Sequence, residues 1–164
     1  MITKMQSRSL ALAAAAIAVG VGSHQALATS QTGTAKAVIL QAISLTENTN
    51  LNFGNILPPA GAANVVLTPA NVISGPGFTF LGGNAAGNWT ALGTAGQPAV
   101  ITFSSGDTLT GPGTAMALDT YTTDAAATFG AGNTLTFNVG ATLHVGSPQT
   151  AGAYSGIYTI TVNY

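Results

Sequence analysis

One stretch of the chain alternates between apolar and polar side chains over the length of a long β-strand. In residues 133–146 (NTLTFNVGATLHVG), apolar side chains occupy every second position, with threonine, asparagine and histidine among those between them. A period of two predicts a strand with one buried and one solvated face. The predicted buried face consists of Leu135, Phe137, Val139, Ala141, Leu143 and Val145. Gly140 indicates a bend, a bulge or a close approach by another backbone.

Short runs of Val, Ile, Thr, Phe and Tyr, separated by clusters of Gly, Pro and Asn, follow one another along the rest of the chain. The expected strands are 35–45, 51–56, 64–69, 77–82, 99–105, 115–121, 133–146 and 156–164. The glycine- and asparagine-rich stretch 82–88 is expected to be a turn. This spacing of short strands predicts an all-β fold, an immunoglobulin-like antiparallel β-sandwich.

The N-terminus has the features of a secretory signal peptide. Lys4 and Arg8 precede an apolar run at 10–22, and small residues follow at 26–28. This pattern predicts a signal peptide over 1–28, with cleavage after Ala28. The chain is therefore expected to be exported, through the periplasm to the cell surface or the medium. No apolar stretch is long enough for a membrane-spanning helix.

Charged residues make up only 4% of the chain, against about 25% in an average globular domain. After residue 28 there remain Lys36 and four acids, a net charge of −3; the acids are Glu47, Asp107, Asp119 and Asp124. Nucleic acid is excluded as a partner, because neutralising phosphates requires many basic residues. A surface poor in charge suits a protein that is packed or polymerised. Cysteine is absent, so stability must come from packing, backbone pairing or a partner.

The sequence predicts no catalytic residue, cofactor site or metal site. His144 is the only histidine after residue 28, and the spacing of Asp119 and Asp124 is not that of a calcium loop. A surface histidine and loop aspartates are the simpler interpretation. The triplet at Asn88 matches a glycosylation site, and Trp89 is expected in a loop or the core.

Two stretches carry a family resemblance. Residues 43–58 (ISLTENTNLNFGNILP) and 135–164, which end in QTAGAYSGIYTITVNY, resemble a family of exported bacterial proteins known only as a domain of unknown function. More distantly, the LNFG element and the terminal strand resemble the spore-coat-U-like pilins of archaic chaperone–usher fimbriae. Those pilins commonly carry cysteines, which this chain lacks. The resemblance implies an incomplete sandwich, held open by a periplasmic chaperone and completed by a donor strand from the next subunit.

The resemblance also implies a division of the mature chain. Residues 29–40 are the candidate donor strand, and residues 41–164 are the sandwich domain. The candidate donor residues are Ala35, Ala37, Val38, Ile39 and Leu40. The candidate groove or chaperone edge consists of Ile157, Tyr158, Ile160, Val162 and Tyr164. In the alternative arrangement, residues 29–45 pair within their own domain as an ordinary first strand.

The expected function is therefore a non-enzymatic, pilin-like subunit of a surface fibre or coat. It would self-associate by donor-strand complementation, with a chaperone and an outer-membrane usher as partners, and act in adhesion or biofilm formation. The alternative is a monomeric secreted module that binds a sugar or a protein. A third class, a hydrolase, would require His144 and an acid within hydrogen-bonding reach in a cleft.

Overall fold

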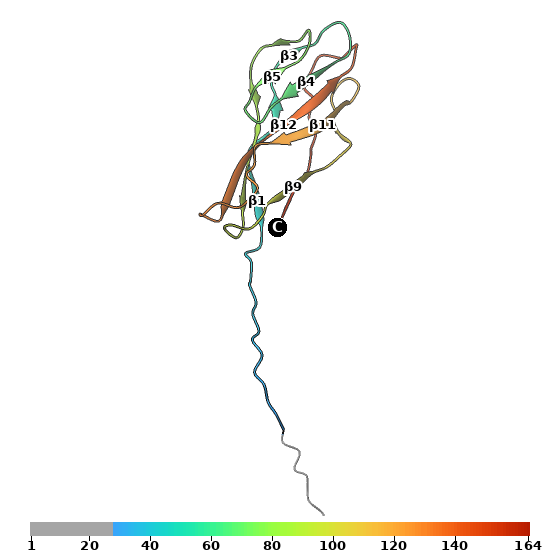
Figure 1. Ribbon diagram of the computed structural model, residues 1–164. Coiled ribbons are helices and arrows are strands. Elements are labelled where there is room, and N and C mark those ends of the chain that lie inside the picture. Colours follow the sequence, from blue (N-terminus) through green and yellow to red (C-terminus); the bar gives the residue numbers. More distant parts are fainter. Residues whose placement is uncertain (1–27) are drawn as a thin grey trace, which may run out of the picture. The chain divides into compact units, whose positions relative to one another are not determined.

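Two antiparallel β-sheets pack face to face in the computed structural model, which describes residues 28–164 (Figure 1). The strands are β1 (Ser44–Thr49), β2 (Asn52–Phe53), β3 (Ile56–Leu57), β4 (Ala63–Leu67), β5 (Ile73–Ser74), β6 (Thr79–Phe80), β7 (Asn84–Ala85), β8 (Gly87–Leu92), β9 (Val100–Phe103), β10 (Asp107–Leu109), β11 (Met116–Thr123), β12 (Thr134–Val145) and β13 (Ile160–Asn163). No helix occurs between residues 28 and 164, and so no helix there could cross a membrane. The all-β sandwich prediction is confirmed.

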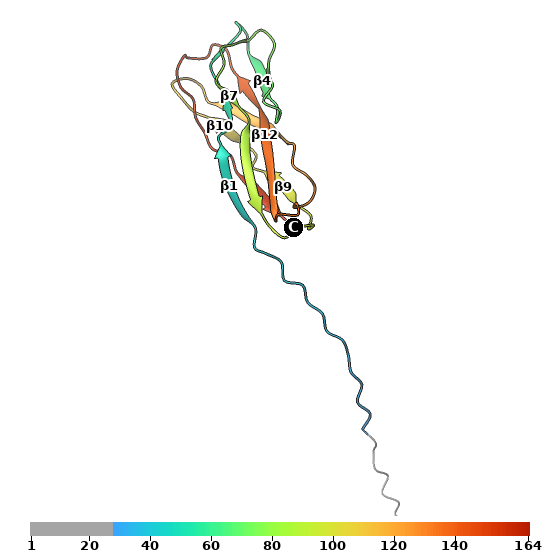
Figure 2. The same ribbon diagram turned by 90° about the vertical axis from the view of Figure 1, so that its left-hand side faces the viewer.

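The larger sheet is organised around β12, the longest strand (Figure 2). Its order is β1-β8-β12-β11-β10, and β4 pairs with β12 and with β5. The first half of β12 pairs with β8 and its second half pairs with β4, along the same edge. β11 pairs with the opposite edge, because Leu143 lies opposite both Val65 and Leu118. One strand therefore joins both ends of the sandwich.

The second sheet contains β9 and β13, paired from Ile160 opposite Phe103 to Asn163 opposite Val100. Two further ladders are short: β2 pairs with β7, and β3 pairs with β6. An isolated bridge joins Thr110 to Ser155, so the chain pairs beyond the end of β10 before it reaches β13.

The predicted buried face of β12 is confirmed, since all six of its side chains are buried. They contribute to two core clusters. The first core cluster is Phe53, Val65, Leu67, Met116, Leu118, Ala141, Leu143 and Val145. The second core cluster is Ala91, Phe129, Leu135, Phe137, Val139, Ile160 and Val162. Tyr121 packs against both clusters and joins them.

The close backbone approach predicted at Gly140 is also confirmed. A Cβ atom at this position would lie 2.1 Å from the carbonyl oxygen of Leu67, at the end of β4. On the other edge of β12, the pairing register of β11 shifts between Asp119 and Thr122, opposite the same region. Only glycine therefore fits where β12 meets β4 and β11.

Several predicted strand boundaries are wrong. The expected strand 35–45 begins only at Ser44, and residues 28–43 have no assigned strand. The expected strand 156–164 begins at Ile160. The stretch 82–88, expected to be a turn, contains β7 and the start of β8, a central strand of the larger sheet. Its glycine and asparagine residues have neighbours on the sheet that the sequence alone does not reveal.

Residues 28–37 and residues 38–164 form two separate units. All of residues 28–37 are exposed, as are Val38 and Ile39 at the start of the second unit. The whole candidate donor segment 29–40 is therefore outside the secondary structure. The predicted signal peptide lies outside the described residues, apart from Ala28.

Candidate strand-acceptor groove

Both sheets end in a strand with one free edge. β1 has β8 as its only neighbour, and β13 has β9 as its only neighbour, so within residues 28–164 no strand pairs with their other edges. These free edges lie on the same side of the sandwich. Ile43 and Leu45 pack against the cluster that contains Ile160 and Val162. In addition, the hydroxyl of Tyr164, directly after β13, donates a hydrogen bond to the Gln41 carbonyl before β1.

The strand order matches an immunoglobulin constant-type domain that lacks one strand. That fold has strands A-B-E-D in one sheet and C-F-G in the other. Here β1-β8-β12-β11 have the order A-B-E-D, and β9 and β13 correspond to C and F. Strand G would pair with the free edge of β13. No strand of residues 28–164 occupies that place.

A groove with a volume of about 720 Å³ opens on this side of the fold. One wall includes Glu47 and the chain from Asn50 to Ile56, and the other is the chain from Gly152 to Tyr158. Between the walls lie apolar side chains of β10, β11 and β12: Leu109, Met116, Leu118 and Leu143. The groove therefore leads to the first core cluster, and its floor is apolar.

Glu47 is a charged residue on the inner side of β1. Leu45, two positions earlier, packs against the second core cluster, and Glu47 lines the groove. Asn48, the residue after Glu47, points to the outer face, where its side-chain amide donates to Asn88 and to Thr90 at 2.9 Å each. Glu47 is nevertheless exposed, because no part of the described chain covers it.

The other three acids have partners. Asp107 accepts hydrogen bonds from the hydroxyls of Ser104 and Tyr121, both at 2.7 Å. Asp119 accepts one from His144, and Asp124 accepts two from Asn138. Within residues 28–164 the carboxylate of Glu47 makes no hydrogen bond and no ion pair. It is the one acid among residues 28–164 that has no hydrogen-bonding partner there.

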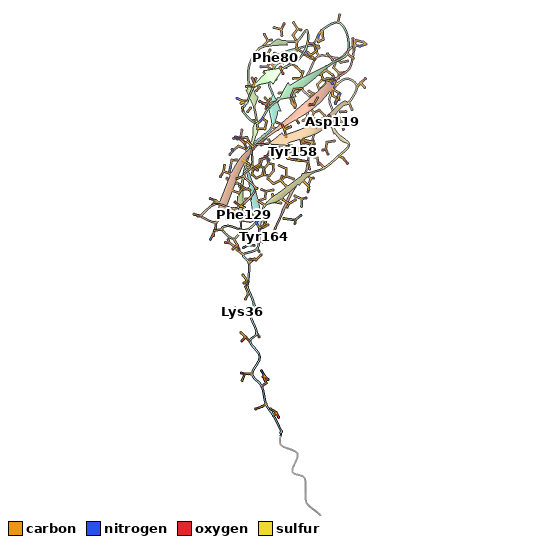
Figure 3. The ribbon with its side chains drawn as sticks, in the orientation of Figure 1. Lys36, Phe80, Asp119, Phe129, Tyr158 and Tyr164 are labelled. Carbon is orange, nitrogen blue, oxygen red and sulfur yellow. The ribbon has the colours of Figure 1, made fainter. Side chains whose placement is uncertain are left out.

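A row of stacked aromatic side chains stands beside the groove and connects the two sheets. One of them, Tyr158, is labelled in Figure 3. The ring of Tyr158 stacks on Tyr121 at 5.3 Å between centroids, and Tyr121 stacks on Phe103 at 5.1 Å. The indole of Trp89 meets Tyr158 edge-on and donates a hydrogen bond to its hydroxyl at 3.2 Å. Gly87 lies under that hydroxyl, and a Cβ atom on Gly87 would be 2.8 Å from it. Stacking and this hydrogen bond hold Tyr158, at the end of this wall, in place.

Burial raises the pKa of Tyr121 above that of an ordinary tyrosine, and its hydrogen bond to Asp107 raises the pKa further. Burial also raises the pKa of Tyr158, partly offset by the hydrogen bond from Trp89. Both phenols therefore stay neutral at physiological pH, and they contribute packing and hydrogen bonds to the wall.

The predicted edge residues fall into two groups. Ile157 and Tyr158 line the groove, and Ile157 is 87% exposed. Ile160 and Val162 are the buried side chains of β13, and Tyr164 packs on Phe129 at 5.6 Å between ring centroids. None of these three residues lines the groove; its lining ends at Tyr158, and β13 begins two residues further along the chain. The other wall, from Glu47 to Ile56, was not predicted, because no pattern in the sequence indicates which strands meet across the core.

The predicted donor residues are available for contact. Val38 is 83% exposed and Ile39 is 94% exposed, while Leu40 is 36% exposed. Ala35 and Ala37 are exposed as well. Neighbouring apolar side chains that are exposed in this way are typical of a surface that a partner covers.

His144 and Asp119 form a pair on the outer face of the larger sheet. Their atoms Nε2 and Oδ1 are 2.9 Å apart, and the side chains are 40% and 50% exposed. The hydrogen bond from His144 lowers the pKa of Asp119 below its usual value. Asp119 lies in β11, whereas a loop position was expected. Neither residue lines the groove, and the part of the chain described here has no cluster of three metal-ligating side chains.

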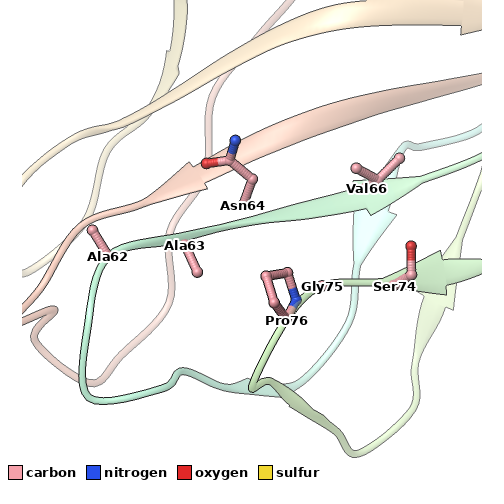
Figure 4. Close-up of a pocket in the computed structure, with 7 residues that line it drawn as sticks. All are labelled: Ala62, Ala63, Asn64, Val66, Ser74, Gly75 and Pro76. Atoms are coloured by element: carbon pink, nitrogen blue, oxygen red, sulfur yellow. The ribbon is translucent and has the colours of Figure 1, made fainter.

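A second cavity, of about 680 Å³, lies between β4 and β5 (Figure 4). Its lining is Ala62, Ala63, Asn64, Val66, Ser74, Gly75 and Pro76. None of these side chains titrates or is a nucleophile of ordinary enzymes apart from the Ser74 hydroxyl, which has no base among them. The cavity offers shape but no chemistry.

The side chain of Asn88, in the glycosylation-like triplet, is already engaged. It lies on β8, and its amide nitrogen donates to Asn138 Oδ1 at 2.7 Å. Together with Asn48 and Asp124 it forms a polar ladder across β1, β8 and β12 on the outer face. This ladder fastens β1, one border of the groove, to the rest of the sheet.

The fold and its free edges define an immunoglobulin-like β-sandwich with an open strand position. Residues 43–164 match the family described as domain of unknown function (DUF4402), and the chain belongs to that family. None of the curated proteins or solved structures compared with the chain matches it. The two sequence elements that suggested such a family, LNFG at 51–54 and GAYSGIY at 152–158, form opposite walls of the groove.

Proposed function

We propose that the protein is a structural subunit of a bacterial surface fibre, assembled by donor-strand complementation. Residues 29–40 of one copy would occupy the groove of the next and pair with the free edge of β13. The observation that carries this proposal is the unpaired edge of β13 next to a groove with an apolar floor. An open sheet edge accepts an added strand through its backbone, and neighbouring pockets accept alternate side chains.

The donor segment supplies what the groove lacks. Burying two or three side chains the size of Val38, Ile39 and Leu40 contributes roughly 1.5–3 kcal/mol each. Backbone hydrogen bonds to β13 add about 1 kcal/mol each. Because the groove is already formed, the acceptor has little ordering cost to offset this gain.

The sequence of the segment favours a neighbouring copy over its own groove. To return along its own groove, the chain would have to reverse direction shortly before Ser44. No glycine, proline, asparagine or aspartate occurs between residues 34 and 46, and tight reversals depend on these residues. The Gln41 carbonyl is moreover held by the Tyr164 hydroxyl. A segment that leads straight into β1 is suited to reach another molecule.

The same proposal includes partners and location. A periplasmic chaperone would cover the groove before assembly, and an outer-membrane usher would add subunits to the growing fibre. The chain would be exported by residues 1–28 and would end at the cell surface. Adhesion or biofilm formation would follow from the fibre.

Gel electrophoresis of sheared surface material in detergent tests this function. The wild type should give a ladder of multiples without heating and one band after boiling, because an inserted strand leaves only when the domain unfolds. Deletion of residues 31–40, which keeps Ala28 to Ser30 for signal peptidase, should abolish the ladder. A control with Thr32→Ala and Thr34→Ala, which leaves the apolar part of the segment intact, should retain it.

A single monomer band from the wild type under both conditions would refute the fibre. It would favour the alternative, a monomeric secreted module that binds a ligand through its loops. A ladder that persists in the deletion variant would show that the copies associate through another surface.

A further inference from the structure

The chain after residue 28 has one positive side chain, and residues 28–164 contain one acid without a hydrogen-bonding partner there; both belong to the proposed junction. Lys36 is the only lysine or arginine after residue 28. Glu47 lines the groove and is the one acid of residues 28–164 with no hydrogen-bonding partner there. In a fold with so few charges, this complementarity points to the two ends of one intermolecular contact.

We propose that Lys36 of one copy pairs with Glu47 of the next and thereby fixes the register of the donor strand. The inference rests on the proposed function and specifies its geometry. With Lys36 facing inward, Val38 and Leu40 also face inward, because alternate residues of a strand share a face. Ala37 and Ile39 then face outward.

The position of the groove determines the direction of the donor. Glu47 lies close enough to Tyr158 for its charge to raise the pKa of that phenol. From this level the groove extends along the chain back toward Gly152 and away from β13. A donor antiparallel to β13 places Val38 and Leu40 along this extension, over the apolar floor. A parallel donor would place them over β13, whose Ile160 and Val162 belong to the second core cluster, and Ile43 and Leu45 already pack against that cluster.

The same direction suits the connection to the donor's own domain. β1 begins at the end of the fold where β13 finishes, as the hydrogen bond from Tyr164 to Gln41 shows. Figure 1 shows β3 and β5 at the opposite end of this domain. A donor antiparallel to β13 leaves the groove at that opposite end. The next domain would therefore follow head to tail along the fibre.

An inward-facing acid also excludes unsuitable strands. Charges that point inward at a free edge prevent uncontrolled pairing with other edges. A donor shifted by two residues toward Gly152 would leave Glu47 without a partner and would move Lys36 over the apolar floor of the groove, where an unpaired charge is strongly disfavoured. The pair therefore provides specificity of register as well as attraction.

Charge reversal in the full chain, exported by its own bacterium, tests the inference. The readout is the ladder of multiples seen on unheated gels in detergent. Lys36→Glu alone and Glu47→Lys alone should each reduce the ladder at least about tenfold, because each places like charges together. The double variant should restore it to within about threefold of wild type. Producing the two single variants together in one cell should also restore the ladder, because the donor of each variant then fits the groove of the other.

Recovery on co-production can occur only if the pair forms between copies. Recovery in the double variant without recovery on co-production would mean pairing within one chain, and would overturn the inference. If both single variants keep a wild-type ladder, the register is wrong, although the fibre itself remains. Loss of the ladder on deleting residues 31–40 then shows that the proposed function still holds.

A matched pair of substitutions tests the inward face independently. Val38→Asp should abolish the ladder, because it places a second carboxylate in the groove, whereas Ile39→Asp should reduce it less than about threefold. The two residues are neighbours of similar size and exposure, so folding of the donor's own domain is affected equally. The reverse result would show that Ala37 and Ile39 face inward and would overturn the proposed register.

Discussion

Replacing Gly140 by alanine should destabilise the sandwich more than its single added methyl group suggests. The new Cβ would lie 2.1 Å from Leu67 O, 2.7 Å from Thr68 C and 2.8 Å from Thr68 Cα. All three are backbone atoms, so no side chain can rotate to make room. Gly140 is not among the residues with positive φ, and the effect is therefore steric.

The magnitude follows from what must move. An ordinary contact requires β4 to shift by about 1 Å, and β4 carries Val65 and Leu67, both fully buried. Overpacking of this kind costs about 1–3 kcal/mol. Weakening one or two ladder bonds between β4 and β12 adds about 1 kcal/mol each. We expect a loss of about 3–4 kcal/mol and a fall in Tm of roughly 10–15 °C.

Urea unfolding and thermal unfolding, followed by circular dichroism, measure this loss. Gly132→Ala is the matched control, because its Cβ would meet only the Thr134 hydroxyl, at the ordinary distance of 3.6 Å. The control should stay within about 0.5 kcal/mol of wild type. A Gly140→Ala protein within about 1 kcal/mol of wild type would refute the close approach of β4 and β12.

Two further predictions concern the polar ladder and the buried phenols. Asn88→Ala removes the hydrogen bonds to Asn48 and Asn138 and should cost about 1–3 kcal/mol in urea unfolding; no change would mean that water replaces both bonds fully. The raised pKa values of Tyr121 and Tyr158 mean that stability present below about pH 10 falls as the pH rises above it, since the unfolded chain ionises first. Tyr121→Phe should reduce this alkaline loss, and an unchanged slope of stability against pH would contradict the burial argument.

The parts of the fold that sequence analysis predicted well depend on local patterns. The buried face of β12 follows from alternation, and the role of Gly140 follows from a glycine inside a strand. β8 was missed because its first residues, Gly87 and Asn88, are poor strand formers. Each is explained by a neighbour distant in sequence: Gly87 by the hydroxyl of Tyr158, and Asn88 by Asn48 and Asn138.

The segment 35–43 shows the opposite error. Its apolar, β-branched composition predicted a strand, yet the described chain has none there. A strand forms only where a partner supplies the other half of the hydrogen bonds, and a single copy offers none to this segment. One wall of the groove was predicted from the terminal strand, whereas Glu47 on the other wall was not, because its importance depends on the empty strand position.

The scarcity of basic residues has a consequence for digestion outside the cell. Trypsin cuts only after lysine and arginine, and from Val38 to Tyr164 the fold contains neither. In a free subunit the enzyme could cut only at Lys36, which is exposed, and the cut would remove most of the donor segment while leaving every strand of the sandwich intact. In an assembled fibre with Lys36 held in the next groove, that last site would be covered. Such a fibre would resist trypsin-like proteases along its whole length.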